Sequence, residues 1–306
     1  MEFQEIFIVA TSTVGFISLC KPIISFLRSV WVVFLRPPKN LKDYGSWALI
    51  TGSTDGIGKA LAFEMASKGL NLVLVGRNPS KLEATSTELH EKCGGQIQIK
   101  NIVIDLAKFS GEEIGNAIEE GIKGLDVGIL INNAGVDLEL MESTMKVNIE
   151  GATWVTKAVL PIMLKKKKGA IVNIGSASSE ILPSYPLYTV YAASKAYISM
   201  FSKSISLEYK KHGIDVQCQI PMLVATKMTK LKPSSFFVAS PEMYSKASMR
   251  WIGYEHLCTP YWGHSVQWLI IHVLPDVLLN AIILRYFIGM RRRGQLKESQ
   301  NKSKQM

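Results

Sequence analysis

Tyr191 and Lys195 are the residues of this 306-residue chain whose types and spacing best suit chemistry. Residues four apart on a helix lie one above the other, so an ammonium group would lie beside the phenol oxygen. A nearby positive charge favours the phenolate and lowers the tyrosine pKa from about 10 toward the range in which general acids work. The pair predicts a proton donor, although the same spacing also occurs on ordinary solvated helix faces.

A glycine-rich stretch far upstream gives this pair a context. Residues 46–50 are apolar enough to form a buried strand, and they lead into residues 51–58, after which a helix is predicted. Glycines between a strand and a helix let the backbone turn tightly and approach a pyrophosphate at the positive end of the helix. The residues that we predict to bind a dinucleotide in this stretch are Gly52, Ser53, Thr54, Asp55, Gly56, Ile57 and Gly58.

Strands and helices alternate after this turn. We predict strands at residues 71–75, 97–104 and 127–131, and helices at residues 79–93 and 112–122. Such alternation is typical of a parallel sheet that helices cover on both faces. The predicted fold class is therefore α/β, a doubly wound parallel sheet of the Rossmann type.

The end of the second predicted strand discriminates between nicotinamide cofactors. A site that prefers NAD places an acidic residue there to bind the ribose 2′-hydroxyl. This chain has Arg77 and Asn78 instead, with Lys81 a turn later. Because a guanidinium group pairs well with a 2′-phosphate, the sequence favours NADPH. The alternative is an exposed arginine at the start of a helix.

Four motifs in this order resemble the short-chain dehydrogenase/reductase family over about residues 45 to 230. They are the glycine-rich stretch at residues 51–58, Asn132-Asn133-Ala134-Gly135, a serine near the fifth strand, and Tyr191 with Lys195. Within the family, further segments resemble the microsomal very-long-chain 3-oxoacyl-CoA reductases, particularly the plant members. These segments are residues 35–37, 44–48, 125–135, 216–219, 224–230 and 258–262.

The resemblance implies roles for the matching residues. Tyr191 would protonate the carbonyl oxygen on which hydride attack builds negative charge, and Ser176 would orient that oxygen, with Ser178 and Ser179 as alternatives. Lys195 would lower the pKa of Tyr191 and hold the nicotinamide ribose. Asn148 would hold a water against the lysine. The further cofactor contacts that the resemblance implies are Asp105, Asn133, Val224 and Thr226, and we predict no metal site.

One segment departs from the family pattern. The stretch between Gly135 and Asn148 is shorter than is usual in the family, where it forms one wall of the active site and part of a contact between subunits. The shorter segment raises the alternative of a protein that binds cofactor and turns over little. The resemblance also allows a homodimer.

The ends of the chain indicate a membrane. Residues 1–45 contain two apolar runs, at residues 6–20 and 23–35, and basic residues follow them. We predict a retained membrane anchor and interfacial segment that places the remainder of the chain in the cytosol. A cleaved signal peptide fits less well because the chain begins with acidic rather than basic residues. A buried core helix is the other alternative.

The C-terminal segment is also apolar, over residues 266–290, but polar residues interrupt it. We predict a membrane-lying helical pair or a wall for a long acyl chain rather than a clean span. Lys302 and Lys304 near the end match the Lys-x-Lys-x-x form of an endoplasmic reticulum retrieval signal, with a disordered basic tail as the alternative. The predicted domains are thus residues 1–45, 46–264 and 265–306.

The formal net charge of +10 agrees with an anionic membrane face or phosphorylated ligands. No basic array with interleaved aromatic residues indicates nucleic acid binding. The sequence and the resemblance together imply an NADPH-dependent enzyme of the endoplasmic reticulum membrane, with its catalytic domain in the cytosol, that reduces very-long-chain 3-oxoacyl-CoA during fatty acid elongation. Elongase subunits are allowed as partners. The alternatives are a steroid or lipid 17-keto reductase and a weakly active paralogue that is a structural partner of the elongase complex.

Overall fold

The computed structural model describes residues 3–135, 141–229, 231 and 235–305. The chain divides into two compact units, residues 1–38 and residues 39–306. In the first unit, helix α1 (Phe3–Val30) runs into a π-helical turn, η1 (Trp31–Leu35). No helix within the described ranges combines the length and the apolarity that crossing a membrane requires, so the predicted anchor is not confirmed.

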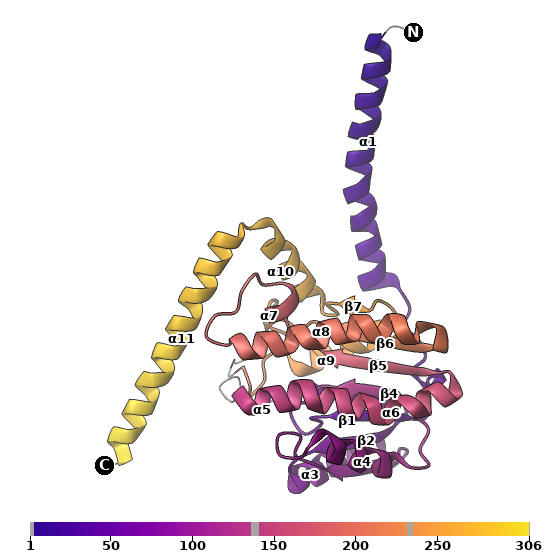
Figure 1. Ribbon diagram of the computed structural model, residues 1–306, viewed down its shortest axis with the longest axis vertical. Coiled ribbons are helices and arrows are strands. Elements are labelled where there is room, and N and C mark those ends of the chain that lie inside the picture. Colours follow the sequence, from indigo (N-terminus) through magenta and orange to yellow (C-terminus); the bar gives the residue numbers. More distant parts are fainter. Residues whose placement is uncertain (1–2, 136–140, 230, 232–234, 306) are drawn as a thin grey trace. The chain divides into compact units, whose positions relative to one another are not determined.

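The second unit is built on a parallel sheet of seven strands in the order β3-β2-β1-β4-β5-β6-β7 (Figure 1). The strands are β1 (Trp47–Thr51), β2 (Asn71–Gly76), β3 (Ile99–Val103), β4 (Val127–Asn132), β5 (Gly169–Ile174), β6 (Ile214–Gln219) and β7 (Leu257–Cys258). The chain leaves β1 toward one edge of the sheet and returns beside it as β4. Ligands of such sheets bind at this switch in strand order, outside the carboxyl ends of the strands.

Helices and helical turns connect the strands. They are η2 (Leu41–Asp43), α2 (Gly56–Ser67), α3 (Pro79–Cys93), α4 (Gly111–Ile122), α5 (Met141–Met145), η3 (Lys146–Gly151), α6 (Ala152–Lys166), α7 (Ala177–Glu180), α8 (Thr189–Tyr209), η4 (Lys210–His212), α9 (Pro241–Trp251), α10 (Trp262–Val273) and α11 (Asp276–Gln305). The helices predicted at residues 79–93 and 112–122 are confirmed as α3 and α4.

Two apolar layers hold the sheet. Ala48 and Ile50 of β1 pack in a core with residues of α2, α3 and α9, whereas Leu49 between them packs in a second core with residues of α4, α6 and α8. Successive strand side chains point to opposite faces, so a strand covered on both sides is apolar throughout. The predicted α/β class and Rossmann-type sheet are therefore confirmed.

Candidate active site

A cleft of about 540 Å³ opens where the chain leaves the carboxyl ends of the central strands. Most of the residues predicted from the sequence line it: Gly52, Thr54, Asp55, Gly56, Ile57, Arg77, Asn78, Lys81, Asp105, Asn133, Ser176, Tyr191, Lys195, Val224 and Thr226. Ser53, Gly58 and Asn148 are the predicted residues that do not. Ser53 is fully buried, and its hydroxyl donates to the carbonyl of Val75 at 3.4 Å, so its side chain turns into the sheet.

Close backbone packing shapes the glycine-rich turn. A Cβ on Gly58 would lie 2.3 Å from the carbonyl oxygen of Gly52, a distance that no side chain tolerates. Gly52 itself has a φ of +65°, the left-handed region that favours glycine. The amide of Asn133 donates to the carbonyls of Thr51 and Gly52 at 3.1 and 3.2 Å and fixes the turn against the end of β4. The turn is therefore rigid and leaves its backbone open to the cleft.

Some polar side chains of the cleft bond the protein backbone, and others are free to face a ligand. Asn78 caps α3, because its side-chain oxygen accepts the Lys81 backbone N–H at 2.9 Å. Asp105 accepts the N–H of Ala107 at 3.1 Å and so orders the turn after β3. Arg77 is exposed at the end of β2 and presents a guanidinium group to the same space.

Ser176 and Tyr191 meet at the inner end of the cleft. Both residues line it, and the Ser176 side chain is close enough to the Tyr191 hydroxyl to lower its pKa. The hydroxyl of Ser178 donates to the Ser176 hydroxyl at 2.9 Å, and that of Ser179 donates to the Ser176 carbonyl at 3.0 Å. Of these three serines, Ser176 is the one that lines the cleft, while the other two orient it.

Lys195 is buried below Tyr191. Its ammonium donates to the carbonyl of Ile174 at 2.8 Å and lies 5.9 Å from the centroid of the Tyr191 ring. Burial lowers the pKa of Lys195 to about 8. Burial also raises the pKa of Tyr191, and the Ser176 side chain only partly offsets this. The sequence predicts the opposite direction for Tyr191, because residue spacing indicates a nearby charge but not the cost of desolvation.

Asn148 lies behind Lys195 in the π-helical turn η3. Its amide nitrogen donates to the Ser194 hydroxyl at 2.9 Å, and that hydroxyl donates to the Tyr191 carbonyl at 2.7 Å. The buried Asn148 side-chain oxygen has no hydrogen-bond partner among the described residues. Asn148 and Lys195 line a cavity of about 10 Å³, which is the size of one water molecule. This geometry suits the predicted water-holding role.

His264 of α10 supports the segment that carries Met222 of the cleft, and the sequence did not indicate it. It is fully buried, and Nδ1 accepts the backbone N–H of Met222 at 3.3 Å while Nε2 lies 3.2 Å from the carbonyl of Leu223. With the hydrogen on Nε2, both ring nitrogens are satisfied by consecutive residues of the cleft wall. A lone histidine without a motif offers no sequence signal for such a role.

Burial lowers the pKa of His264 to about 4 from its ordinary value of 6.5. Between these values the unfolded chain binds the proton first, so the free energy of unfolding decreases as pH falls from 6.5 toward 4, by about 3 kcal/mol from this residue. Urea unfolding at several pH values measures the effect. We expect His264→Gln, which retains a donor and an acceptor, to show a shallower decrease. Equal slopes for the two proteins would contradict the prediction.

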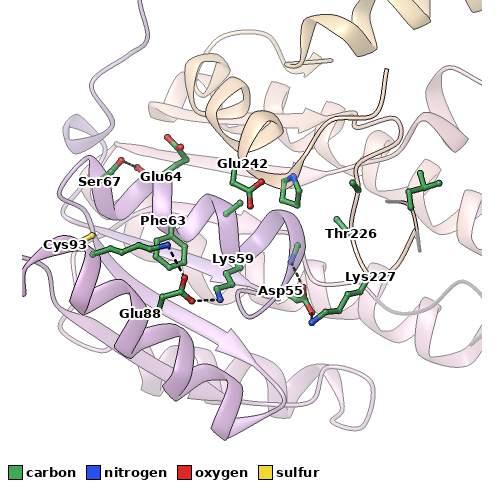
Figure 2. Close-up of a pocket in the computed structure, with 16 residues that line it drawn as sticks. Asp55, Lys59, Phe63, Glu64, Ser67, Glu88, Cys93, Thr226, Lys227 and Glu242 are labelled. Atoms are coloured by element: carbon green, nitrogen blue, oxygen red, sulfur yellow. Dashed lines mark hydrogen bonds and ion pairs between the residues drawn. The ribbon is translucent and has the colours of Figure 1, made fainter. Parts of the chain in front are cut away.

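A second groove of about 890 Å³ lies beside the cleft, along α2 (Figure 2). Lys59 and Lys92 both pair with Glu88, at 2.5 and 3.1 Å, and Lys227 pairs with Asp55 at 2.8 Å. Neighbouring carboxylates therefore neutralise much of the positive charge, and the groove is a poor site for an anion. No cluster of His, Cys, Asp and Glu among the described residues is arranged to hold a metal ion.

The structure describes part of the shortened segment before Asn148. Residues 136–140 lie outside the described residues, and the chain continues as α5 and η3. The prediction that this segment affects turnover stays a prediction.

The parallel sheet, the glycine-rich turn and the Ser176, Tyr191 and Lys195 cluster define a short-chain dehydrogenase. Residues 46–235 match the short chain dehydrogenase family, and the chain belongs to this family of oxidoreductases. A very-long-chain 3-oxoacyl-CoA reductase-like protein of Arabidopsis thaliana is 46% identical over 297 residues, which are 92% of this chain and 93% of that protein. The very-long-chain 3-oxoacyl-CoA reductase of Mus musculus is 36% identical over 270 residues, 84% of each chain.

Two further comparisons bear on activity and cofactor. The inactive hydroxysteroid dehydrogenase-like protein 1 of Homo sapiens is 40% identical over 253 residues, 78% of this chain and 75% of that protein. Among solved structures, a short-chain dehydrogenase from Sphingobium yanoikuyae in complex with NADPH is 27% identical, with a TM-score of 0.57, and covers 66% of this chain and 82% of that one. Similarity thus extends to both active and inactive relatives.

Proposed function

We propose that this protein reduces very-long-chain 3-oxoacyl-CoA to 3-hydroxyacyl-CoA with NADPH. The observation that carries the proposal is that Ser176 and Tyr191 line the same cleft, with the Lys195 ammonium buried beside the Tyr191 ring. The names of the plant and mouse relatives support the acyl-CoA substrate. The NADPH complex of the bacterial relative supports the cofactor.

The residues of the cleft fit NADPH. The turn at residues 51–58 lets a pyrophosphate approach its backbone, and Arg77 offers a guanidinium group to a 2′-phosphate. When bound, NADPH supplies the hydride. Ser176 donates its hydrogen to the substrate carbonyl and so orients it, and Tyr191 gives its proton to the oxygen as negative charge develops there. Lys195, which is cationic below pH 8, stabilises the phenolate that remains.

Cofactor preference depends on Arg77. We expect Arg77→Ser to lower kcat/KM for NADPH roughly thirtyfold and to leave kcat/KM for NADH within about twofold, because a charge-assisted pair with a phosphate is lost. Steady-state assays with both cofactors measure the ratio. Lys100→Ser, which removes an exposed cation outside the cleft, is the control. Equal losses for NADPH and NADH would show that Arg77 does not contact a 2′-phosphate.

The substrate is tested by NADPH consumption with the full-length protein in microsomes. A long-chain 3-oxoacyl-CoA should be reduced, with 3-hydroxyacyl-CoA as the product. Faster turnover of a 17-ketosteroid would favour the steroid alternative. Binding of NADPH without turnover of either substrate would favour the weakly active paralogue, the candidate that the inactive human relative supports.

We also propose that the protein resides on the cytosolic face of the endoplasmic reticulum membrane, where elongase subunits or a second copy would be its partners. The apolar runs within residues 6–35, the exposed Arg291, Arg292 and Arg293, and the Lys302 and Lys304 pattern support this location. Imaging of the tagged chain tests it. Substitution of both terminal lysines by serine should release the protein to later compartments, and unchanged retention would remove the retrieval signal from the proposal.

A further inference from the structure

The C-terminal helix α11 reaches the proposed catalytic tyrosine through a chain of aromatic rings. The Phe287 ring lies 4.7 Å from the Tyr185 ring and 5.2 Å from the Tyr188 ring, edge to face in both cases. The Tyr185 ring in turn lies 6.2 Å from the ring of Tyr191. These centroid distances are typical of favourable aromatic pairs. A helix that begins 85 residues after Tyr191 therefore shapes its surroundings, since α11 starts at Asp276.

Helix α11 has two different faces along this stretch. Leu279, Ile283 and Phe287 recur every four residues and are only 6%, 9% and 5% exposed. They pack on Leu182, Tyr185 and Tyr188, in the segment of residues 181–188 that leads into α8 (Figure 1). Their chain neighbours Leu278 and Ile282 are 48% and 50% exposed. One face of the helix therefore packs on this segment, and the other is exposed.

The segment of residues 181–188 is the covalent link between α7, which Ser176 caps, and α8, which carries Tyr191. Helix α11 holds it with a polar contact as well, because the Ser184 hydroxyl donates to the Asn280 side-chain oxygen at 2.6 Å. Leu187 has a φ of +69°, a left-handed conformation that costs a residue other than glycine free energy. The surrounding contacts, including those from α11, keep the segment in this conformation.

We propose that Tyr185 and Tyr188 form an aromatic wall on which the apolar chain of an acyl-CoA packs beside the reacting carbonyl, and that Phe287, which packs against both rings, is a positioning residue that sets the preference for chain length. The inference rests on the proposed function. A carbonyl that contacts Ser176 and Tyr191 places its adjoining chain within reach of Tyr185, because the Tyr185 and Tyr191 rings are neighbours. The Tyr185 and Tyr188 rings are partly exposed and carry no charge, so they gain free energy when a hydrocarbon chain covers them, whereas Phe287 is buried behind them.

The test compares substrates of different chain length with the full-length protein. We expect Phe287→Ala to lower kcat/KM for a long-chain 3-oxoacyl-CoA roughly tenfold and to leave kcat/KM for acetoacetyl-CoA and the KM for NADPH within about twofold. Phe287→Leu should restore most of the preference. Two neighbouring variants on α11 form a matched pair. Ile283→Ala should lower the ratio of kcat/KM for the long-chain substrate to kcat/KM for acetoacetyl-CoA, as Phe287→Ala does, whereas Ile282→Ala should leave this ratio unchanged.

A purely structural role of α11 would lower kcat/KM for the long-chain substrate and for acetoacetyl-CoA alike. The proposal of an aromatic wall is therefore overturned if Phe287→Ala leaves the ratio of these two kcat/KM values unchanged. It is also overturned if Ile282→Ala and Ile283→Ala shift this ratio equally. Binding of palmitoyl-CoA, which has no 3-oxo group, provides a readout without turnover. If the wild-type protein binds palmitoyl-CoA but reduces no 3-oxoacyl-CoA, only the proposed function is contradicted. The aromatic wall is then tested by binding alone, and it predicts that Phe287→Ala binds palmitoyl-CoA more weakly than the wild type. Wild-type protein that binds no palmitoyl-CoA overturns both.

Discussion

Tyr191→Phe should lower kcat for the reducible substrate roughly a thousandfold and leave the Kd of NADPH within about twofold. The substitution removes only the hydroxyl that would donate the proton. The ring that packs against Tyr185 remains, so the helix and the cleft keep their shape. Single-turnover oxidation of NADPH measures the chemical step, and fluorescence titration of NADPH measures binding.

Tyr185→Phe is the matched control for this experiment. It removes a hydroxyl from the neighbouring ring, which lies 6.2 Å from that of Tyr191, and it keeps the ring itself. We expect its kcat to stay within about threefold of the wild type, since no proton transfer is assigned to it. If Tyr191→Phe retained more than about a tenth of the wild-type kcat, another group or water would have to be the proton donor.

Lys195→Met should lower kcat/KM by roughly a hundredfold to a thousandfold, because the phenolate left by proton transfer loses its cation. Burial lowers the pKa of Lys195 to about 8, so the wild-type residue is charged below this value and loses its charge as pH rises through it. The kcat/KM of the wild type should therefore decrease above pH 8. In Lys195→Met this decrease should be absent, and a profile that still falls above pH 8 would assign it to another group.

Stability gives an independent readout for the same variant. Since the folded-state pKa of Lys195 lies below the ordinary lysine value, the unfolded chain binds the proton more tightly, and the buried cation lowers the free energy of unfolding at neutral pH. We expect Lys195→Met to unfold at a urea concentration no lower than that of the wild type. If Lys195→Met lost its structure as well as its activity, the expected stability would be contradicted. The loss of activity would then result from unfolding and would say nothing about catalysis.

Local patterns were sufficient to predict the frame of the site. The glycines of residues 51–58 need no long-range information, because a strand, a tight turn and a helix follow each other directly in the chain. Tyr191 and Lys195 share a helix face because of helix geometry alone. Arg77 indicates the cofactor because a basic rather than an acidic residue follows the second strand. The alternation of elements predicted the sheet, and the structure confirms it with α3 at the predicted residues.

Other features depend on segments far apart in the chain. His264 binds the backbone of Met222 and Leu223 from α10, and Phe287 reaches Tyr185 from α11. Both helices follow the part of the chain that matches the family, which ends at residue 235. Neither residue has a neighbour in the sequence whose type or spacing indicates its partner, so no local pattern could predict these contacts.

The sequence by itself determined the fold class, the nucleotide-binding turn and the placement of an ammonium group beside a phenol. Only the tertiary structure decided that Lys195 is buried and Tyr191 half-buried, that the pKa of Tyr191 is raised rather than lowered, and that Phe287 of α11 packs on the tyrosine ring beside it. The physical reason is that helix and turn geometry arises from neighbours along the chain, whereas desolvation depends on every segment that packs around a group.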